Sequence, residues 1–283
     1  MFANHPKGLK VLFYTELWER MSYYGMRGLL VLFMTASISD GGLNYSNISA
    51  SAIYGIYASS VYLLALPGGW IGDRILGQQK AILYGGLIIT LGHFILAINF
   101  TSTFFFGLTF VVLGTGLLKP NISALVGSLY HKKENLKQSG FTLFYMAINV
   151  GSVLGFFICG YLGEKIGWHY GFSAAGFGMA LGILRYKYNL PILGNIGLKP
   201  NLQITHSEKR RDIKLVLISL VIICSILLSG TLGIVKFNPV PLANILTLII
   251  SLIAILYFFY IFMLGDLNTQ EKKNITMIIV LFI

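Results

Sequence analysis

Long stretches of this chain contain no aspartate, glutamate, lysine or arginine. They cover residues 41–72, 81–118, 138–163, 215–235 and 237–265. A helix needs about 20 predominantly apolar residues to cross the hydrocarbon core of a membrane, so each stretch is long enough for a crossing. Only 11% of the residues are charged, against about 25% in an ordinary globular domain. The chain is therefore predicted to be an all-α, multi-pass membrane protein.

The apolar pattern predicts eight membrane spans, followed by a further apolar run that begins at residue 275 and continues to residue 283. The eight spans cover residues 9–36, 50–73, 79–100, 103–130, 137–164, 169–190, 213–234 and 242–264. Segment 191–212 is polar, basic and contains two prolines, as is typical of a linker. We therefore divide the chain into a six-helix unit (1–190), a linker (191–212), a hairpin (213–264) and a last segment (265–283).

Charge predicts the orientation of these spans. A net charge of +11 and a pI near 9.6 would suit a nucleic-acid-binding protein if the chain were soluble. In membrane proteins, however, lysine and arginine collect in cytoplasmic loops. If the N-terminus is cytoplasmic, nearly all loop lysines and arginines lie on the cytoplasmic side, and only Lys165 and Lys236 lie opposite. We expect a cytoplasmic (inner) membrane location, a cytoplasmic N-terminus, the lipid bilayer as surroundings and no nucleic-acid partner.

The first predicted span carries charge where a lipid-facing helix would not. At about 100° per residue, one face gathers a narrow stripe of ionisable side chains: Glu16, Arg20, Tyr23 and Arg27, with Glu19 at its edge. A charge at mid-bilayer costs about 2.5–3.5 kcal/mol and usually pairs or lines a watery cavity. An interfacial amphipathic helix, or charges that reach toward one membrane surface, is the alternative. A stripe over three turns favours the cavity, and Glu16 and Arg20 are spaced to pair.

Lys119 is a second charge within an apolar region. It follows an uncharged run and precedes Pro120, which frees backbone carbonyls and favours a kink. The alternative is that Lys119 ends its helix early. With the two acids and two guanidiniums of the first span, Lys119 gives the predicted cavity one excess positive charge. Such a cavity suits an anion, for example the α-carboxylate of a peptide.

Weaker signals lie in two other places. Asp73 and Arg74, between the second and third spans, can pair across a short solvated turn. In the fifth span, Gly151 and Gly155 form a small-residue face that favours close helix packing. Asn149 is an amide in mid-span, suited either to an interhelical hydrogen bond or to contact with a ligand.

The remaining polar signals indicate neither catalysis nor metal binding. Cys159, Cys224 and His93 sit singly in apolar runs, and no recognised metal-binding or nucleophile motif is present. We therefore expect no metal, no cofactor and no enzymatic activity.

Three motifs resemble signatures of the proton-dependent oligopeptide transporters, a branch of the major facilitator superfamily. With x for any residue, they are Glu16-x-x-Glu19-Arg20-x-x-Tyr23-Tyr24-Gly25, Gly68-Gly69-x-x-x-Asp73-x-x-Leu76-Gly77 and Phe144-Tyr145-x-x-Ile148-Asn149-x-Gly151-Ser152. The resemblance extends along essentially the whole chain. It implies a six-helix N-terminal bundle, the two-helix hairpin that bacterial members insert between their halves, and the start of a seventh core helix.

The resemblance also implies roles for single residues. The proton-coupling cluster would be Glu16, Glu19, Arg20 and Lys119. The peptide site would be lined by Tyr23, Tyr24, Arg27, Tyr62, Lys119 and Asn149, and the cytoplasmic gate loop would contain Asp73 and Arg74. Two positions depart from the family pattern: Met21 replaces a phenylalanine, and Gln78 replaces an arginine, which predicts a looser gate contact.

The function that the resemblance implies is symport of di- and tripeptides with protons, driven by the proton gradient. Full family members have twelve core helices, whereas this chain reaches only the start of the seventh. We therefore expect a truncated or split transporter that requires a C-terminal half, with little transport by this chain alone. The alternatives are a non-transporting fragment or half that assembles with a partner, and a related carrier for another anion such as nitrate. A membrane enzyme is a more distant alternative.

Overall fold

The structure, a computed structural model, describes residues 2–98, 101–235, 237–265 and 267–282 of the 283-residue chain. Within these ranges the regular structure is helical throughout, which confirms the all-α prediction. The long helices are α1 (Lys7–Thr35), α2 (Asn47–Ile71), α3 (Gln78–Leu96), α4 (Thr101–Ser128), α5 (Lys137–Lys165), α6 (Trp168–Leu193), α7 (His206–Thr231), α8 (Pro239–Leu264) and α9 (Thr269–Phe282). Lys236, used in the charge argument, lies outside the described residues.

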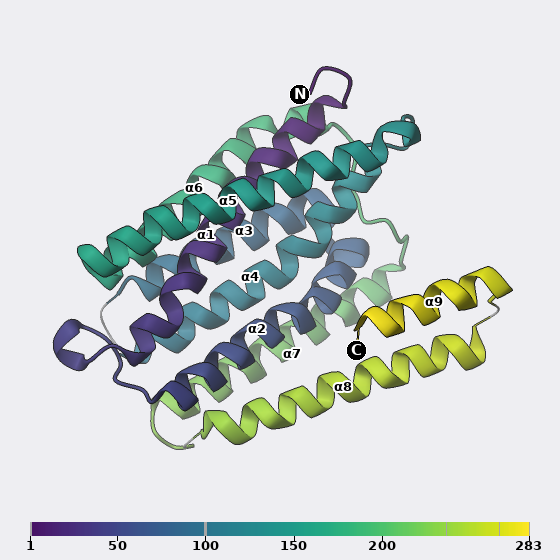
Figure 1. Ribbon diagram of the computed structural model, residues 1–283. Helices are drawn as coiled ribbons and strands as arrows, with labels where there is room; N and C mark the ends of the chain where they lie inside the picture. Colours follow the sequence, from purple (N-terminus) through teal and green to yellow (C-terminus); the bar gives the residue numbers. More distant parts are fainter. Residues whose placement is uncertain (1, 99–100, 236, 266, 283) are drawn as a thin grey trace.

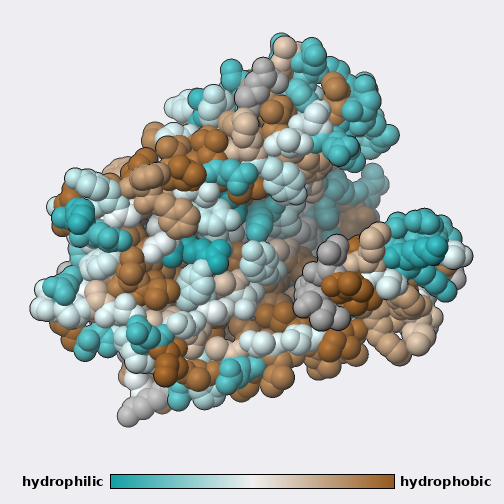
Figure 2. Space-filling view, in the orientation of Figure 1, coloured by the Kyte–Doolittle hydropathy of each residue, from teal (hydrophilic) through white to brown (hydrophobic). Residues whose placement is uncertain are grey.

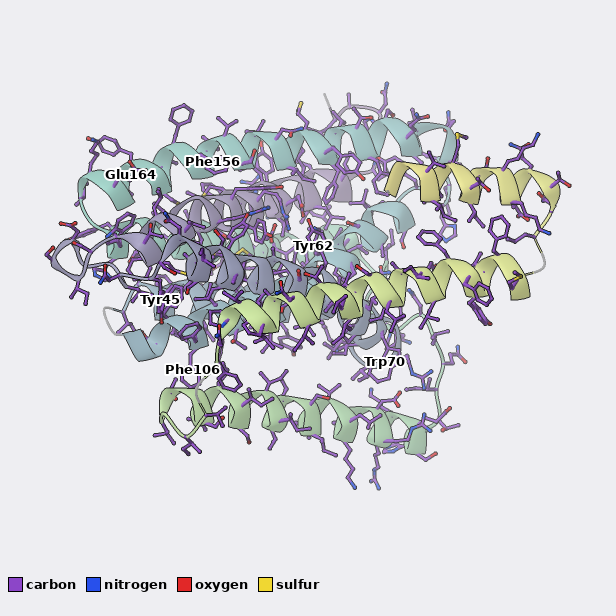
Figure 3. All side chains as sticks on the ribbon, turned by 60° about the horizontal axis from the view of Figure 1, so that its bottom comes forward. Tyr45, Tyr62, Trp70, Phe106, Phe156 and Glu164 are labelled. Atoms are coloured by element: carbon purple, nitrogen blue, oxygen red, sulfur yellow. The ribbon has the colours of Figure 1, made fainter. Side chains whose placement is uncertain are left out.

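The first six helices form a bundle of two groups (Figure 1). Helix α1 packs against α5 and α6, while α4 packs against α2 and α3. The contact between α3 and α6 joins the two groups. Helix α8 lies along α2, and α7 stands away from the bundle, as the turned view in Figure 3 makes plain.

Glycines allow α1 and α5 to approach closely. A Cβ atom on Gly155 would lie 2.3 Å from the carbonyl oxygen of Met21, and one on Gly151 would lie 2.4 Å from that of Leu17. Both distances are below van der Waals contact, so only glycine fits. The predicted small-residue packing face of the fifth span is confirmed, and this contact fixes the position of the charged stripe on α1.

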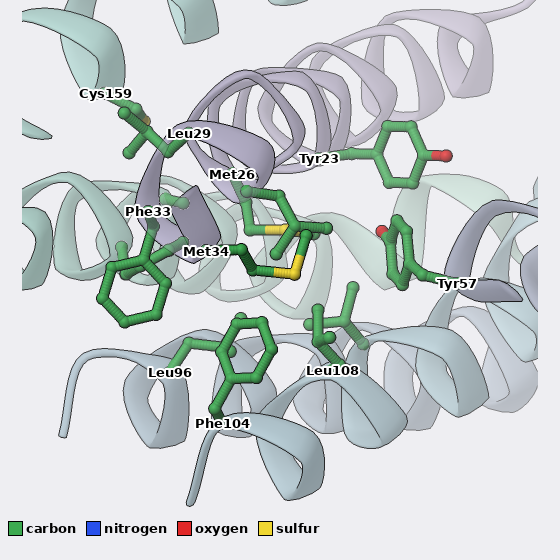
Figure 4. Packing of buried hydrophobic residues seen from close by; sticks show 14 of the residues in the cluster. Tyr23, Met26, Leu29, Phe33, Met34, Tyr57, Leu96, Phe104, Leu108 and Cys159 are labelled. Atoms are coloured by element: carbon green, nitrogen blue, oxygen red, sulfur yellow. The ribbon is translucent and has the colours of Figure 1, made fainter. Parts of the chain in front are cut away.

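A hydrophobic core lies between the C-terminal half of α1 and its neighbouring helices. Met26, Phe33 and Met34 of α1 pack there with Phe104 and Leu108 of α4 (Figure 4). These side chains are almost completely buried. The core therefore holds α1 against the α2–α4 group at one end of the charged stripe.

Among the residues that the structure describes, six helices are long and apolar enough to cross a membrane. These spans are Asn47–Leu76, Gln78–Leu96, Thr103–Ser128, Glu134–Lys165, His206–Thr231 and Pro239–Met263. Helices α1 and α6 have similar lengths, 29 and 26 residues, but α1 carries the charged stripe and α6 carries basic residues toward its C-terminal end. Their packing places both inside the bundle. The outer helices α7 and α8 expose apolar side chains all round, which suits contact with lipid.

The non-helical linker in the structure is shorter than the predicted linker, 191–212. Helix α6 continues through Pro191 to Leu193, and α7 begins at His206, seven residues before the predicted start. The early start has a local cause, because Thr205 and Glu208 form a capping box that satisfies the first backbone N–H groups of α7. The non-helical linker therefore covers only residues 194–205.

Candidate functional site

The acids and the first arginine of α1 form one buried ionic cluster. The Nε atom of Arg20 lies 3.1 Å from Oε1 of Glu16 and donates a hydrogen bond to Oε2 of Glu19. None of the three side chains is more than 3% exposed. The second oxygen of each carboxylate and one terminal nitrogen of Arg20 have no hydrogen-bond partner among the described residues. Two carboxylates therefore share one guanidinium in the buried interior of the bundle.

Lys119 is the cation on the neighbouring group of helices. It is half-buried on α4, and its positive charge acts attractively on Glu16. Its Nζ atom makes no salt bridge with a described residue but lies 4.5 Å from the ring centroid of Tyr62. The structure thus brings Lys119 near the α1 cluster without pairing it.

Each of the three cations of the predicted site faces a tyrosine ring. The Cζ atom of Arg20 lies 5.0 Å from the ring centroid of Tyr23. The Cζ atom of Arg27 lies 5.1 Å from that of Tyr54, whose hydroxyl also accepts a hydrogen bond from Nε of Arg27. A ring face attracts a cation while leaving its full charge available to an anion. We had not identified Tyr54 from the sequence.

Tyr23 and Tyr24 of α1 lie in the interfaces with α2 and α5, respectively. The ring of Tyr23 stacks on that of Tyr57, with centroids 6.4 Å apart and planes 28° apart, and Figure 4 shows the two rings next to each other. Tyr24 is half-buried and contacts Phe156 of α5. Tyr54 and Tyr57 are three residues apart on α2. This i, i+3 spacing was the available signal that both face α1.

Two predicted site residues have exposed side chains. Tyr62, labelled in Figure 3, is 61% exposed. Asn149 is exposed and donates a hydrogen bond only within α5, to the backbone oxygen of Tyr145 at 3.3 Å. Asn149 therefore does not form an interhelical hydrogen bond with any described residue. Figure 2 shows the face of the molecule that is seen in Figure 1. Hydrophilic residues lie across the middle of this face, between α5 and α2, with hydrophobic residues around them.

The predicted pair of Asp73 and Arg74 is wrong. Nε of Arg74 instead donates to Oδ2 of Asp212 at 2.8 Å, and Oδ1 of Asp73 accepts from Nδ2 of Asn201 at 2.8 Å. The cause is that the linker and the first turns of α7 fold back over the α2–α3 turn, where Asn201 of the linker and Asp212 of α7 are the partners. Asp212 is almost completely buried, although it falls in the segment 191–212 that the sequence predicts to be a polar linker.

The same turn binds the linker through Gln79. Its side-chain nitrogen donates to the backbone oxygens of Gly194 at 2.9 Å and Ile196 at 2.8 Å, and its backbone N–H donates to Gly197 at 2.9 Å. The adjacent Gln78, which departs from the family motif, is buried against Gly197. Residues 194–212, which are the non-helical linker and the first turns of α7, thus form a strap, here called the linker strap, across the α2–α3 turn.

No metal centre is evident in the described parts of the chain, where no three His, Cys, Asp or Glu side chains lie close enough to hold an ion. His93 is completely buried in α3, beside Gly176 of α6, and its ring nitrogens have no partner there. The site is therefore built from carboxylates, guanidiniums, an ammonium and phenols.

Helices of membrane-spanning length around a buried, incompletely paired ionic cluster define a multi-pass α-helical membrane protein with a polar site between its helices. Comparison with known proteins gives the particular family. The chain belongs to the POT family, whose sequence pattern matches residues 79–283. The predicted family resemblance is confirmed.

Relatives match along the entire chain. The peptide transporter YePEPT of Yersinia enterocolitica is 37% identical over 100% of this chain and 57% of its own length. A di-/tripeptide transporter of Lactococcus lactis subsp. cremoris is 38% identical over 100% of this chain and 58% of its own. The chain therefore spans rather more than half the length of these curated relatives.

Solved structures agree with the fold. A crystal structure of a POT family transporter in complex with a thioalcohol-conjugated peptide superposes with a TM-score of 0.87 at 34% identity, covering 99% of this chain and 58% of that one. A crystal structure of the peptide transporter POT in complex with sulfate gives a TM-score of 0.85 at 36% identity, covering 98% of this chain and 56% of that one.

Proposed function

We propose that this chain provides the N-terminal half of a proton-coupled symporter of di- and tripeptides. It would lie in the cytoplasmic membrane with its N-terminus in the cytoplasm. The observation that carries the proposal is the buried cluster in which Glu16 and Glu19 share Arg20. The peptide transporters among its relatives support the substrate class.

The charge balance of the cluster suits proton binding. With both acids ionised, the α1 cluster has one excess negative charge in a water-poor region, which is costly unless it is neutralised. A proton on Glu16 removes that excess and leaves Arg20 paired with Glu19. Protonation also releases Lys119 from the attraction of Glu16, so that its ammonium is available to an anion.

The peptide would bind beside this cluster. Arg27 and Lys119 are cations without a carboxylate partner among the described residues, and they suit the α-carboxylate of a peptide. Tyr23, Tyr24 and the exposed Tyr62 and Asn149 would line the remaining contacts. Because protonation frees Lys119 for the substrate, proton and peptide favour the same state, as symport requires.

A second half would complete the site. Transporters of this architecture bind substrate between two repeats that rock against each other. The exposed face bearing Tyr62 and Asn149 would meet that C-terminal half, which would bind the amino group of the peptide. Asp73 and Arg74 would belong to the cytoplasmic gate loop, held in place by the linker strap.

The test uses the complete transporter, this chain together with a C-terminal half, reconstituted in liposomes. We expect an inward proton gradient to drive uptake of a labelled dipeptide. Glu16→Gln should reduce gradient-driven uptake strongly while peptide exchange without a gradient persists, because only the protonation step is lost. Lys119→Ala should weaken dipeptide binding about tenfold, the loss expected for one charge-assisted contact.

Equal loss of uptake and exchange in Glu16→Gln would contradict the proton role. Unchanged dipeptide affinity in Lys119→Ala would remove that residue from the site. Uptake of labelled nitrate that an excess of dipeptide does not inhibit, without uptake of the labelled dipeptide, would favour the anion carrier instead. Uptake by this chain alone would contradict the need for a second half.

A further inference from the structure

Arg27 is held differently from the other arginine of the site. Arg20 contacts two carboxylates of its own helix, whereas the hydrogen bond that Arg27 makes with a described residue goes to a phenol, the Tyr54 hydroxyl on α2. The ring of Tyr54 also faces the guanidinium of Arg27. Tyr54 packs against the apolar core at its edge, so its ring is fixed by its neighbours.

The consequence of the Arg27–Tyr54 hydrogen bond depends on which nitrogen atom of Arg27 donates it. The phenol accepts from Nε of Arg27, on the inner side of the guanidinium. The two terminal nitrogens have no hydrogen bond with a described residue. These two nitrogens form one of the edges with which arginine binds a carboxylate through two parallel hydrogen bonds. Because the phenol is neutral, it orients the guanidinium without cancelling its charge.

We propose that Tyr54 is a positioning residue, which holds Arg27 by Nε so that its terminal nitrogens present a fork to the carboxylate of a bound ligand. The inference rests on the proposed function for the identity of that ligand. Its physical basis is preorganisation, since a guanidinium held in advance loses less conformational entropy when the anion binds. Without the hydroxyl, the long side chain of Arg27 would sample several rotamers.

The neighbouring Tyr57 provides a matched control. It lies on the same helix face as Tyr54, and its buried ring stacks on Tyr23. Its hydroxyl has no hydrogen-bond partner among the described residues. Tyr57→Phe therefore removes the same atom as Tyr54→Phe, from the same helix, without removing a contact to Arg27.

The first measurement requires no transport. The 283-residue chain, labelled with ¹⁵N-arginine and held in lipid nanodiscs, is examined by NMR. The Nε–H signal of Arg27 is assigned by its disappearance in Arg27→Lys. We expect Tyr54→Phe to shift this signal and to speed its exchange with water, while Tyr57→Phe leaves it unchanged. An unchanged signal in Tyr54→Phe, or the same change in Tyr57→Phe, would overturn the proposal.

The second measurement tests the consequence for an anion. N-acetylalanine, which has a carboxylate but no free amino group, is titrated while the Arg27 signal is observed. We expect Tyr54→Phe to weaken this titration about tenfold and Tyr57→Phe to leave it unchanged. Equal titrations in wild type and Tyr54→Phe would refute the positioning role. Failure of dipeptide uptake by the complete transporter would contradict the proposed function but not the role of Tyr54, because neither NMR measurement depends on uptake.

Discussion

Two ionic contacts in this molecule, one buried and one partly exposed, arise in opposite ways. Arg20 is paired with acids of its own helix, one and four residues away, whereas Arg74 is paired with Asp212, 138 residues away. The first contact lies in the interior of the bundle. The second lies at the α2–α3 turn, where Arg74 is 20% exposed and Asp212 only 1%.

The difference distinguishes the α1 cluster, a candidate functional site, from the Arg74–Asp212 pair, a structural contact. The α1 cluster has more acid than base and is incompletely paired, so its charge state can change when a proton or an anion arrives. The Arg74–Asp212 pair has one charge of each sign and joins the linker strap to the bundle. Removal of a charge should therefore have different consequences at the two places.

The largest effect is expected for Arg20→Ala. It leaves two carboxylates buried without their guanidinium, and breaking a buried pair in this way typically costs about 3–5 kcal/mol. The free energy of unfolding in detergent, from denaturant titration, measures the loss. The triple change Arg20→Met, Glu16→Gln and Glu19→Gln should restore most of the stability, because no unpaired charge remains. A wild-type unfolding curve for Arg20→Ala would show that the cluster is solvated.

A smaller effect is expected for Asp212→Asn. The amide keeps the shape but loses the charge-assisted bond to Arg74, which costs about 1–3 kcal/mol. Hydrogen exchange should accelerate in residues 194–205 while α1 stays protected. Arg211→Ala is the control, because Arg211 is 67% exposed and lies 3.5 Å from the same carboxylate. Its effect should remain within about 0.5 kcal/mol. Equal exchange in wild type and Asp212→Asn would show that the contacts of Gln79 and Asp73 hold the strap without the Arg74–Asp212 pair.

The smallest effect is expected from salt. Raising the ionic strength from 0.01 M to 1 M shortens the screening length from about 30 Å to about 3 Å, and partly exposed pairs are screened more than buried ones. Hydrogen exchange in the linker strap should rise by about twofold, since partly exposed pairs contribute little. Exchange in α1 should not change. If salt accelerates hydrogen exchange more in α1 than in the linker strap, the α1 cluster is the more exposed of the two contacts, contrary to the comparison above.

Much of this architecture could be predicted from the sequence, because the controlling interactions are local or periodic. Apolar runs of helix length predicted the helices, and helical periodicity placed Glu16 and Arg20 on one face. The small residues Gly151 and Gly155 predicted a close helix contact. The start of α7 was also encoded locally, in Thr205 and Glu208, but we read that segment as linker.

Only the tertiary structure decided which residues of different helices meet. Periodicity shows which side chains share a face, but it contains no information on the rotation and depth of the neighbouring helix. For that reason Tyr54 was not foreseen as the partner of Arg27, nor Asp212 as the partner of Arg74. A pair within one helix follows from the fixed rise and turn of its backbone, whereas a pair between elements depends on how the whole bundle packs.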